Sequence, residues 1–548
     1  MNTSTGDSER QPQRLLPPRW IWIWLVVCGL LIALVRYWGA AGSAQWFEPL
    51  RDRAHANILT LIISFVATMT LLVWYLFFSG FSKSLRLTTW LLGIGCVVIF
   101  FLVFRIEDVT GNLIPRFTLR WANAPDEDMQ QPIAAETTAD LATTTPDDFP
   151  QFLGPKRLAA VDQIQLNPNW STHSPRQIWQ QGIGAGWSGF AVVNGFAVTM
   201  EQRGSNELTT CYDVQSGDLV WSHAIRTRHS TKMGGTGPRS TPTIADGKVY
   251  SLGATGWLHC LNGVNGQVIW SCNIPEIVGS NASDDLTVVQ WGRSASPLIV
   301  DDLVIVPGGG PPGGEFISLI AFQKDTGNEI WRGGGQQISY SSPNLVSLAG
   351  RQQILTVNES SVAGHDPTIG DELWRYQWPG SSTTNANVSQ AVPVGDDRVF
   401  LSKAYGGGGM LLQIDKMKDQ TLRASEIWAR ISVMKTKFTN VVIYRDSVFG
   451  LSDGRLDCID VNTGKRRWQR GRYANYGHGQ ILRVGDLLLV QGEDGSVAMV
   501  EISADQFREL GRFNALSGKT WNNPAFYKKY LLVRNSLEAA CYELTIHQ

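Results

Sequence analysis

The chain is poor in several things for its length, and each shortage excludes a class of protein. Seven cysteines among 548 residues are too few to staple the chain together, which excludes a small disulfide-built scaffold. Charged residues make up only 17%, below the about 25% that is usual in soluble domains. The formal net charge is −1, so the charge balance gives no reason to expect nucleic-acid binding. No sustained helical periodicity follows Pro175, which excludes helical repeats there.

Long apolar runs are present near the start of the chain. Each approaches or exceeds the about 18–20 residues that cross a bilayer as a helix, and they lie at 20–38, 58–81 and 87–104. We therefore predict a membrane domain of three transmembrane helices, preceded by a cytoplasmic segment at 1–19, with the lipid bilayer as partner. A cleaved signal peptide is the alternative for the first run, because basic residues precede it, namely Arg10, Arg14 and Arg19.

The charge count does not fix the topology of the three runs. Lys and Arg are distributed without asymmetry around them, so the positive-inside rule does not orient them.

Residues 105–150 are acidic and rich in Ala, Thr and Pro toward their end. Such a composition is typical of a flexible linker, and an ordered arm or lid is the alternative.

A repeated motif fills the remaining residues, 151–548. Five times a polar turn is followed by Gly, three residues and Trp, as in NGVNGQVIW ending at Trp270. The unit ending at Trp428 keeps the Trp but replaces the Gly turn with a longer insert. The unit reading QFRELGRF lacks both the Gly turn and the Trp, which leaves Leu510 or Phe513 in the Trp role. The period belongs to propeller blades, which repeat every about 40–50 residues. The repeat tryptophans are Trp179, Trp221, Trp270, Trp331, Trp374, Trp428 and Trp468.

Within each unit, alternating apolar residues separated by turn dipeptides predict four short antiparallel strands. The Gly before each Trp is expected at positive φ, and the Trp is expected to pack between neighbouring blades. The last unit, 519–548, supplies only three strands, and residues 177–181 can complete it. We therefore predict an all-β, eight-bladed propeller with a shared last blade. Four cysteines occupy one repeat position and are expected to be small buried residues: Cys211, Cys260, Cys458 and Cys541.

The Asp-turn-Gly-x-x-x-Trp pattern resembles the repeat of the pyrroloquinoline quinone (PQQ) type propellers. The lead-in FPQFLGPKR is also similar to the start of PQQ-like repeat proteins. That family includes quinoprotein alcohol and glucose dehydrogenases, and also the propeller lipoprotein of outer-membrane β-barrel assembly. The resemblance implies the fold for residues 149–548, but the family mixes enzymes with scaffolds, so the activity does not follow from it.

The resemblance also says what a dehydrogenase of this family would need. It would have adjacent cysteines over the cofactor, a Trp below it, a calcium site and a catalytic Asp. No two cysteines are adjacent here, and the repeated Asp residues are explained by the turn before Gly. No His, Cys and Asp cluster has metal-ligand spacing. We therefore predict no catalytic residue, no metal ligand and no cofactor; PQQ with calcium belongs only to the alternative of a membrane-bound quinoprotein dehydrogenase acting on an alcohol or sugar.

One face of the predicted ring is the candidate binding site. Where each outer strand crosses to the next inner strand, basic and aromatic residues recur near the channel mouth. The crossing before Arg239 adds Arg226, Arg228 and Lys232 with no acid between them. Such a mouth would suit protein partners or a small anionic ligand; the alternative is solvated loops with packed aromatics. The candidate residues are Trp187, Arg239, Arg293, Tyr340, Lys437, His478 and Trp521.

Together these patterns predict a binding or protein-assembly scaffold rather than an enzyme. PQQ-type propellers generally work outside the cytoplasm, and three spans with the N-terminus inside deliver the body there. The resemblance therefore implies a multi-pass protein of the bacterial inner membrane with a periplasmic propeller.

Overall fold

The chain forms two units in the computed structural model, residues 1–122 and residues 123–548. The structure describes residues 15–41, 53–130, 132, 138–469 and 475–547. Most of the expected N-terminal segment at 1–19 lies outside the described residues. Each unit is described by itself below.

The first unit contains the three expected helices. They are α1 (Arg19–Ala41), α2 (Arg53–Phe78) and α3 (Lys83–Val103), and each is long and apolar enough to cross a membrane. Ser82 caps α3, because its Oγ accepts the Leu85 N–H at 3.2 Å. A hairpin of β1 (Phe104–Val109) and β2 (Pro115–Leu119) follows. The helices therefore begin and end within a few residues of the predicted runs.

The second unit is an eight-bladed propeller of four-stranded antiparallel sheets, as predicted. Blade 1 contains β5 (Ala191–Val193), β6 (Phe196–Arg203), β7 (Asn206–Asp213) and β8 (Leu219–Ile225). Blade 2 contains β11 (Thr243–Ala245), β12 (Lys248–Leu252), β13 (Trp257–Asn262) and β14 (Val268–Asn273). Blade 3 contains β15 (Leu298–Val300), β16 (Leu303–Gly309), β17 (Ile317–Gln323) and β18 (Glu329–Gly333). Blade 4 contains β19 (Asn344–Leu348), β20 (Arg351–Val357), β21 (Ser361–His365) and β22 (Glu372–Gln377).

The later blades repeat this order. Blade 5 contains β23 (Val392–Val394), β24 (Arg398–Lys403), β25 (Gly408–Lys416) and β26 (Leu422–Arg430). Blade 6 contains β27 (Val442–Tyr444), β28 (Ser447–Ser452), β29 (Arg455–Asp460) and β30 (Arg466–Gln469). Blade 7 contains β31 (Gln480–Val484), β32 (Leu487–Gln491), β33 (Ser496–Glu501) and β34 (Glu509–Asn514). Short elements in the crossings are β9 (Ser230–Thr231), β10 (Gly235–Thr236), α4 (Ile274–Ile277) and α5 (Ala282–Val288).

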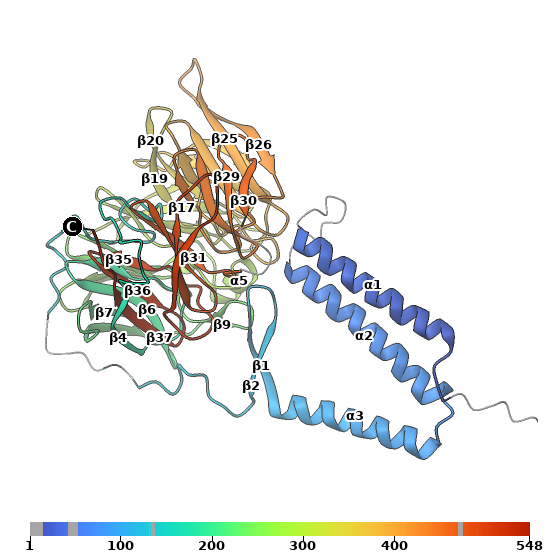
Figure 1. The fold of residues 1–548 in the computed structure, drawn as a ribbon. Coiled ribbons are helices and arrows are strands. Elements are labelled where there is room, and N and C mark those ends of the chain that lie inside the picture. The colour runs from blue at the N-terminus through green and yellow to red at the C-terminus, as the bar shows by residue number, and fades with distance from the viewer. Residues whose placement is uncertain (1–14, 42–52, 131, 133–137, 470–474, 548) are drawn as a thin grey trace, which may run out of the picture. The chain divides into compact units, whose positions relative to one another are not determined.

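The last blade joins the two ends of the body. It contains β35 (Ala525–Tyr527), β36 (Tyr530–Arg534), β37 (Glu538–Glu543) and, from far earlier in the chain, β4 (Arg176–Gly182). β4 pairs antiparallel with β37, and Figure 1 shows the two labels side by side. The predicted shared blade is confirmed, and the ring closes without an unpaired edge at this seam.

The repeat tryptophans dock each blade on the next. In blade 2, Trp270 stands opposite Cys260 just after a β-bulge, and its Nε1 donates to the Lys324 carbonyl of blade 3 at 2.9 Å. Gly327 lies under the indole with φ +73°, and a Cβ there would lie 2.7 Å from Trp270 Cδ2. Only glycine permits that approach. The same stacking recurs for Trp179, Trp221, Trp331 and Trp428 on Gly217, Gly266, Gly370 and Gly464.

Three seams depart from the pattern. In blade 6, Trp468 Nε1 donates to the Ser503 carbonyl of blade 7 at 2.9 Å, but none of the described glycines stacks on its indole. Trp374 bonds to Gln353 of its own blade, because blade 5 has the long hairpin β25–β26 where other blades have the Gly turn. In blade 7 the register position of the Trp, opposite Met499, is Gly511. The prediction that Leu510 or Phe513 takes the Trp role is therefore wrong. Trp170, from the segment before β4, packs on Gly511 and stacks edge-to-face on Phe513 at 5.5 Å.

A belt of polar side chains joins the starts of the inner strands around the ring. Serine, threonine and amide side chains of one blade bond to the backbone of a neighbour, and such links connect all eight blades. They are Gly189 N to Thr241 Oγ1 (3.0 Å), Thr241 N to Ser296 Oγ (2.9 Å), Ser296 N to Ser342 Oγ (2.9 Å), Gln390 Nε2 to Ser342 O (3.2 Å), Gln390 N to Asn440 Oδ1 (3.0 Å), Gln480 Nε2 to Phe438 O (3.1 Å) and to Trp521 O (2.9 Å), and Asn522 Nδ2 to Ser188 O (2.8 Å). The belt fixes the crossings that surround the channel mouth.

Residues 149–162, here called the strap, run across the inner strands. Phe149 bridges to Val192 of blade 1, and the Arg157 guanidinium donates to the Ser296 and Pro297 carbonyls of blade 3, each at 3.0 Å. At its end, β3 (Ala160–Val161) pairs in parallel with β31 of blade 7. Arg157 is 2% exposed, and burial lowers its pKa to about 9. Because inner strands line the channel, the strap lies within the ring.

The segment 105–150, expected as a flexible linker, has structure at both ends. It begins in the β1–β2 hairpin of the first unit. In the second unit Leu141 is 1% exposed within an apolar cluster of blades 1 and 2, and Ala139 N donates to the Val264 carbonyl at 3.2 Å. The few apolar residues of this polar stretch thus pack on the propeller. The described residues favour the ordered arm over the free tether.

Candidate functional site

The predicted channel mouth is a packed collar on one side of the ring. The indoles of Trp187 and Trp521 lie 4.8 Å apart, and the Lys519 ammonium lies over both, at 5.0 Å and 4.3 Å. Phe438 contacts Trp521 at 4.5 Å and His478 at 5.8 Å. The crossings into blades 1, 6, 7 and 8 therefore meet through aromatic and cation–π contacts.

The other side of the collar is held by polar contacts. Arg293 forms an ion pair with Asp285 of α5, with Nε and Oδ2 separated by 2.7 Å. Tyr340 stacks on Trp291 at 4.9 Å, and its hydroxyl donates to the Ser382 carbonyl at 2.7 Å. Burial raises the pKa of Tyr340, so this hydroxyl stays a donor at any physiological pH. The Arg293 cation is thus matched by an acid and is no free anion site.

Arg239 is the partly exposed member of the predicted set. Its guanidinium donates to the carbonyls of Gly234 at 2.8 Å and Gly235 at 3.0 Å, and burial lowers its pKa to about 10. Nearby Glu207 accepts the Ala254 N–H at 3.0 Å, and burial raises its pKa to about 7. Burial and the charge of Arg239 lower the pKa of His229 to about 4. At neutral pH His229 is therefore uncharged, while Arg239 remains a cation.

The structure brings together some of the seven predicted residues and separates others. Trp187, Trp521 and His478 share one aromatic cluster, while Lys437 lies over the Tyr405 ring at 5.9 Å. Six of the seven are buried, all except Arg239. They shape the mouth from within, and direct contact with a partner would fall to exposed residues of the same crossings, such as Lys232 and Met233.

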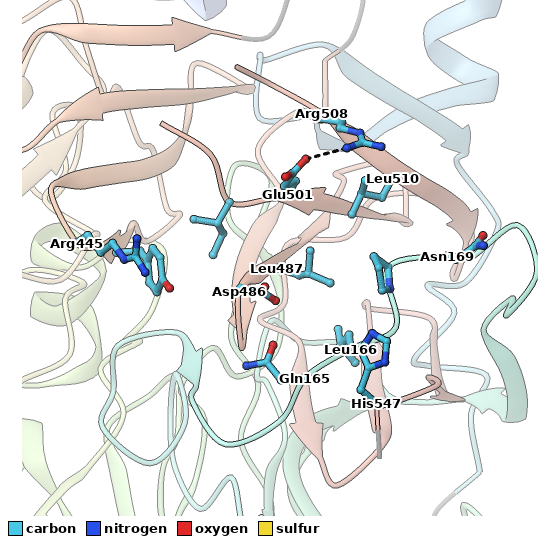
Figure 2. A pocket seen from close by; sticks show the side chains of 13 residues that line it. Gln165, Leu166, Asn169, Arg445, Asp486, Leu487, Glu501, Arg508, Leu510 and His547 are labelled. Atoms are coloured by element: carbon cyan, nitrogen blue, oxygen red, sulfur yellow. Dashed lines mark hydrogen bonds and ion pairs between the residues drawn. The ribbon is translucent and has the colours of Figure 1, made fainter. Parts of the chain in front are cut away.

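A pocket of about 960 Å³ opens on the opposite face, where inner strands end and fourth strands begin. Figure 2 shows Leu487 and Leu510 in its middle and the Arg508–Glu501 ion pair, 3.4 Å long, at one side. Arg445 and His547 lie at separate sides, and Asp486 lies between the blade turns. The lining contains both acids and bases, Asp486 and Glu501 with Arg445 and Arg508, so the pocket has no strong preference for one sign of charge.

The residues present do not fit a PQQ and calcium site. No two cysteines are adjacent in the sequence. Four of the body's cysteines are buried in third strands opposite the repeat position of the fourth strands, away from the mouth, as expected: Cys211, Cys260, Cys458 and Cys541. Within the described part of the chain, no group of three or more His, Cys, Asp and Glu is placed to hold a metal ion. No step of quinone chemistry can therefore be built on these residues.

Comparison with known proteins agrees with the blade pattern. Residues 204–470, from the β6–β7 turn to the end of blade 6, match the PQQ-like repeat family described as outer membrane protein assembly factor BamB. Residues 204–470 of the eight-bladed propeller thus carry the repeat of this family. Outer membrane protein assembly factor BamB of Shewanella oneidensis is 23% identical over 341 residues, covering 53% of this chain and 79% of that protein.

Solved PQQ-like propellers share the fold at low identity. Quinohemoprotein alcohol dehydrogenase from Comamonas testosteroni is similar with a TM-score of 0.54 and 14% identity, covering 73% of this chain and 81% of that chain. BamB from Moraxella catarrhalis gives a TM-score of 0.46 and 14% identity, covering 68% of this chain and 99% of that chain. At 14% identity the likeness to the dehydrogenase concerns the fold and leaves the activity open.

Sequence reasoning missed the residues that act across long sequence distances. Trp170 and Arg157 lie in the lead-in, outside any repeat unit, and Asp126 lies in the segment expected as a linker. The absent Trp of blade 7 was a usable signal for Trp170, because the seam it leaves must be filled by something. No local pattern marked Arg157 or Asp126.

Proposed function

We propose that this protein is a binding or protein-assembly scaffold, anchored in the bacterial inner membrane by α1, α2 and α3, with its propeller on the periplasmic side. The observation that carries this proposal is the match of blades 1 to 6 to the family of an outer membrane assembly factor. The three apolar helices support anchoring in the bilayer. Protein partners are inferred from the name of the Shewanella relative, an outer membrane protein assembly factor.

The face of the crossings is the proposed partner surface. Its collar holds the seven predicted residues in fixed positions, and its rim exposes Lys232 and Met233, the latter 46% exposed. A rigid ring with an adaptable Met and basic groups at the rim suits recognition of a protein surface. The buried collar residues would set the shape of this surface rather than touch the partner.

In-cell photo-cross-linking tests the surface directly. A photoreactive residue at Met233 should give discrete protein adducts. The matched control is Met417, which is 40% exposed at the β25–β26 turn of the opposite face and should give none. Equal adducts from both positions, or none from Met233, would contradict the proposal that the face of the crossings binds the partner.

The dehydrogenase alternative has its own test. We expect no activity, because no two cysteines are adjacent and the described residues offer no group of three or more His, Cys, Asp and Glu for a metal ion. Purified protein in detergent is titrated with PQQ and calcium while cofactor absorbance and dye reduction are followed with alcohols and sugars. Saturable cofactor binding with substrate-dependent dye reduction would replace the scaffold proposal by a quinoprotein enzyme.

A further inference from the structure

The basic crossing of the propeller, residues 226–232, already holds an acidic segment of the same chain. Arg228 projects from this crossing, and its guanidinium contacts both carboxylate oxygens of Asp126, with NH1–Oδ2 at 2.5 Å and NH2–Oδ1 at 3.4 Å. Glu127 lies 3.5 Å from the same guanidinium. The paired approach is the geometry in which an arginine binds a carboxylate most tightly.

Backbone contacts hold this segment, here called the acidic arm (residues 123–130), in register with blade 1. Gly204 N donates to the Asp126 carbonyl at 2.9 Å, and Arg203 donates to the Gln130 carbonyl at 3.0 Å. The Gly204 carbonyl in turn accepts from Arg228 at 2.6 Å. Asp126 is 3% exposed, so the arm is docked as a peptide, by its main chain as well as its charge.

The charges of the two segments are complementary. The crossing carries Arg226, Arg228 and Lys232 and no acid, while the arm carries Asp126, Glu127 and Asp128 and no base. Arg226 and Lys232 are exposed, and in the described ranges neither takes part in an ion pair with another side chain. When the arm leaves, Arg228 keeps one carbonyl partner and presents an open fork for a carboxylate.

We propose that the basic crossing is a docking site for an acidic peptide segment of a partner protein, and that the acidic arm occupies it as an internal competitor. This inference rests on the proposed scaffold function and names the chemistry of its partner. A peptide is favoured over a free phosphate or a lipid headgroup because the docked arm uses a main-chain carbonyl that those ligands lack. Since the arm is tethered, its effective concentration sets a threshold that a partner must exceed.

Peptide binding to the full-length protein in detergent tests the inference. The probe is a fluorescent peptide with the arm sequence NAPDEDMQ, titrated into wild type and into Asp126→Ala/Glu127→Ala. The double variant retains the main-chain contacts and should bind the peptide about tenfold or more tightly than wild type, because the competitor is weakened. Adding Arg228→Glu to the double variant should abolish binding of the peptide. A control peptide with Asn and Gln in place of the acids should not bind to the double variant.

Several outcomes would overturn the inference. Equal affinity in wild type and the double variant would mean that the arm does not compete. Binding that survives Arg228→Glu would place the peptide elsewhere. Binding of inorganic phosphate or of anionic lipid vesicles at this site in preference to the peptide would reassign its ligand. Adducts at Met233 that persist in Arg228→Glu would leave the scaffold function standing while this docking site fails.

Discussion

One glycine determines how closely a repeat tryptophan approaches the next blade. Gly327 has φ +73° and lies under Trp270, whereas Gly350, in the β19–β20 turn, has φ +74° and no atom within 4 Å of an added Cβ. Both Gly327→Ala and Gly350→Ala incur the left-handed backbone cost of about 1–2 kcal/mol. Gly327→Ala alone adds steric overlap with the indole, about 1–3 kcal/mol more. Denaturant midpoints of the two variants should therefore differ; equal midpoints would deny the close stacking.

Trp270 itself should be costly to truncate. Its ring is buried in the seam between blades 2 and 3 and its Nε1 is bonded, so Trp270→Ala should lower the free energy of unfolding by about 3–5 kcal/mol. Trp121 is 68% exposed and belongs to the first unit, so Trp121→Ala should stay within about 0.5 kcal/mol. Thermal melting of both variants in the same detergent compares them. Similar losses from the two would contradict the docking role.

Two histidines in the seam of blades 1 and 2 should make the propeller sensitive to acid. His223 and His259 meet edge-to-face at 4.9 Å, and burial lowers the pKa of both, that of His259 to about 4. A folded-state pKa below the unfolded value of 6.5 means that the unfolded chain binds more protons, so stability falls as pH drops from about 6.5 toward 4.

His259→Phe should remove the part of this dependence that His259 contributes, while keeping a ring stacked on His223. Near pH 7.5 the variant should differ little from wild type, and at pH 5 it should be more stable by about 2 kcal/mol. Glu207 has the opposite effect on the pH dependence of stability, because its pKa is raised to about 7. Both proteins contain Glu207, so its contribution cancels in the difference between them. Parallel melting curves from pH 7.5 to 5 measure the difference. An unchanged pH profile in the variant would show that His259 is not held neutral.

At the scale of elements, the lead-in completes what blade 7 lacks. Trp170 is 5% exposed and its Cβ lies 3.0 Å from where a Cβ on Gly511 would stand. Trp170→Ala should destabilise the propeller by about 3–5 kcal/mol. Gly511→Trp restores the repeat residue, so it should recover part of that loss in the double variant and be harmful on its own by overpacking. Additive losses in the double variant would contradict the replacement.

The elements also show what can be read from a sequence of this kind. The period of Gly and Trp specifies the blades, the four-strand pattern and the shared last blade, because each unit repeats the same local chemistry. The strap, Trp170 and the acidic arm escape such reading, because each is a single segment whose contacts lie many residues away. Lys437 and His478 lie in the crossings between blades, but their burial depends on neighbours that no repeat predicts.

At the scale of the molecule, the two units differ in the side chains that they expose. The helices of the first unit expose aliphatic and aromatic side chains, as a bilayer requires, while the second unit closes its sheets into a ring with a polar belt and a strap inside. The crossings of the ring expose basic side chains and Met233. These features are consistent with the proposed role of a scaffold anchored at a membrane.

The side of the membrane on which the propeller lies tests this account most directly. Ile369 is 55% exposed in the turn before β22, and in the body Cys211, Cys260, Cys458 and Cys541 are buried while Cys272 is partly buried. Ile369→Cys in otherwise wild-type protein should react with a membrane-impermeant maleimide in intact spheroplasts, while the wild type gives the background. Labelling at that stage, with a cytoplasmic marker protected, is the predicted result. Labelling that begins only after the membrane is permeabilised would place the propeller in the cytoplasm and contradict a periplasmic scaffold.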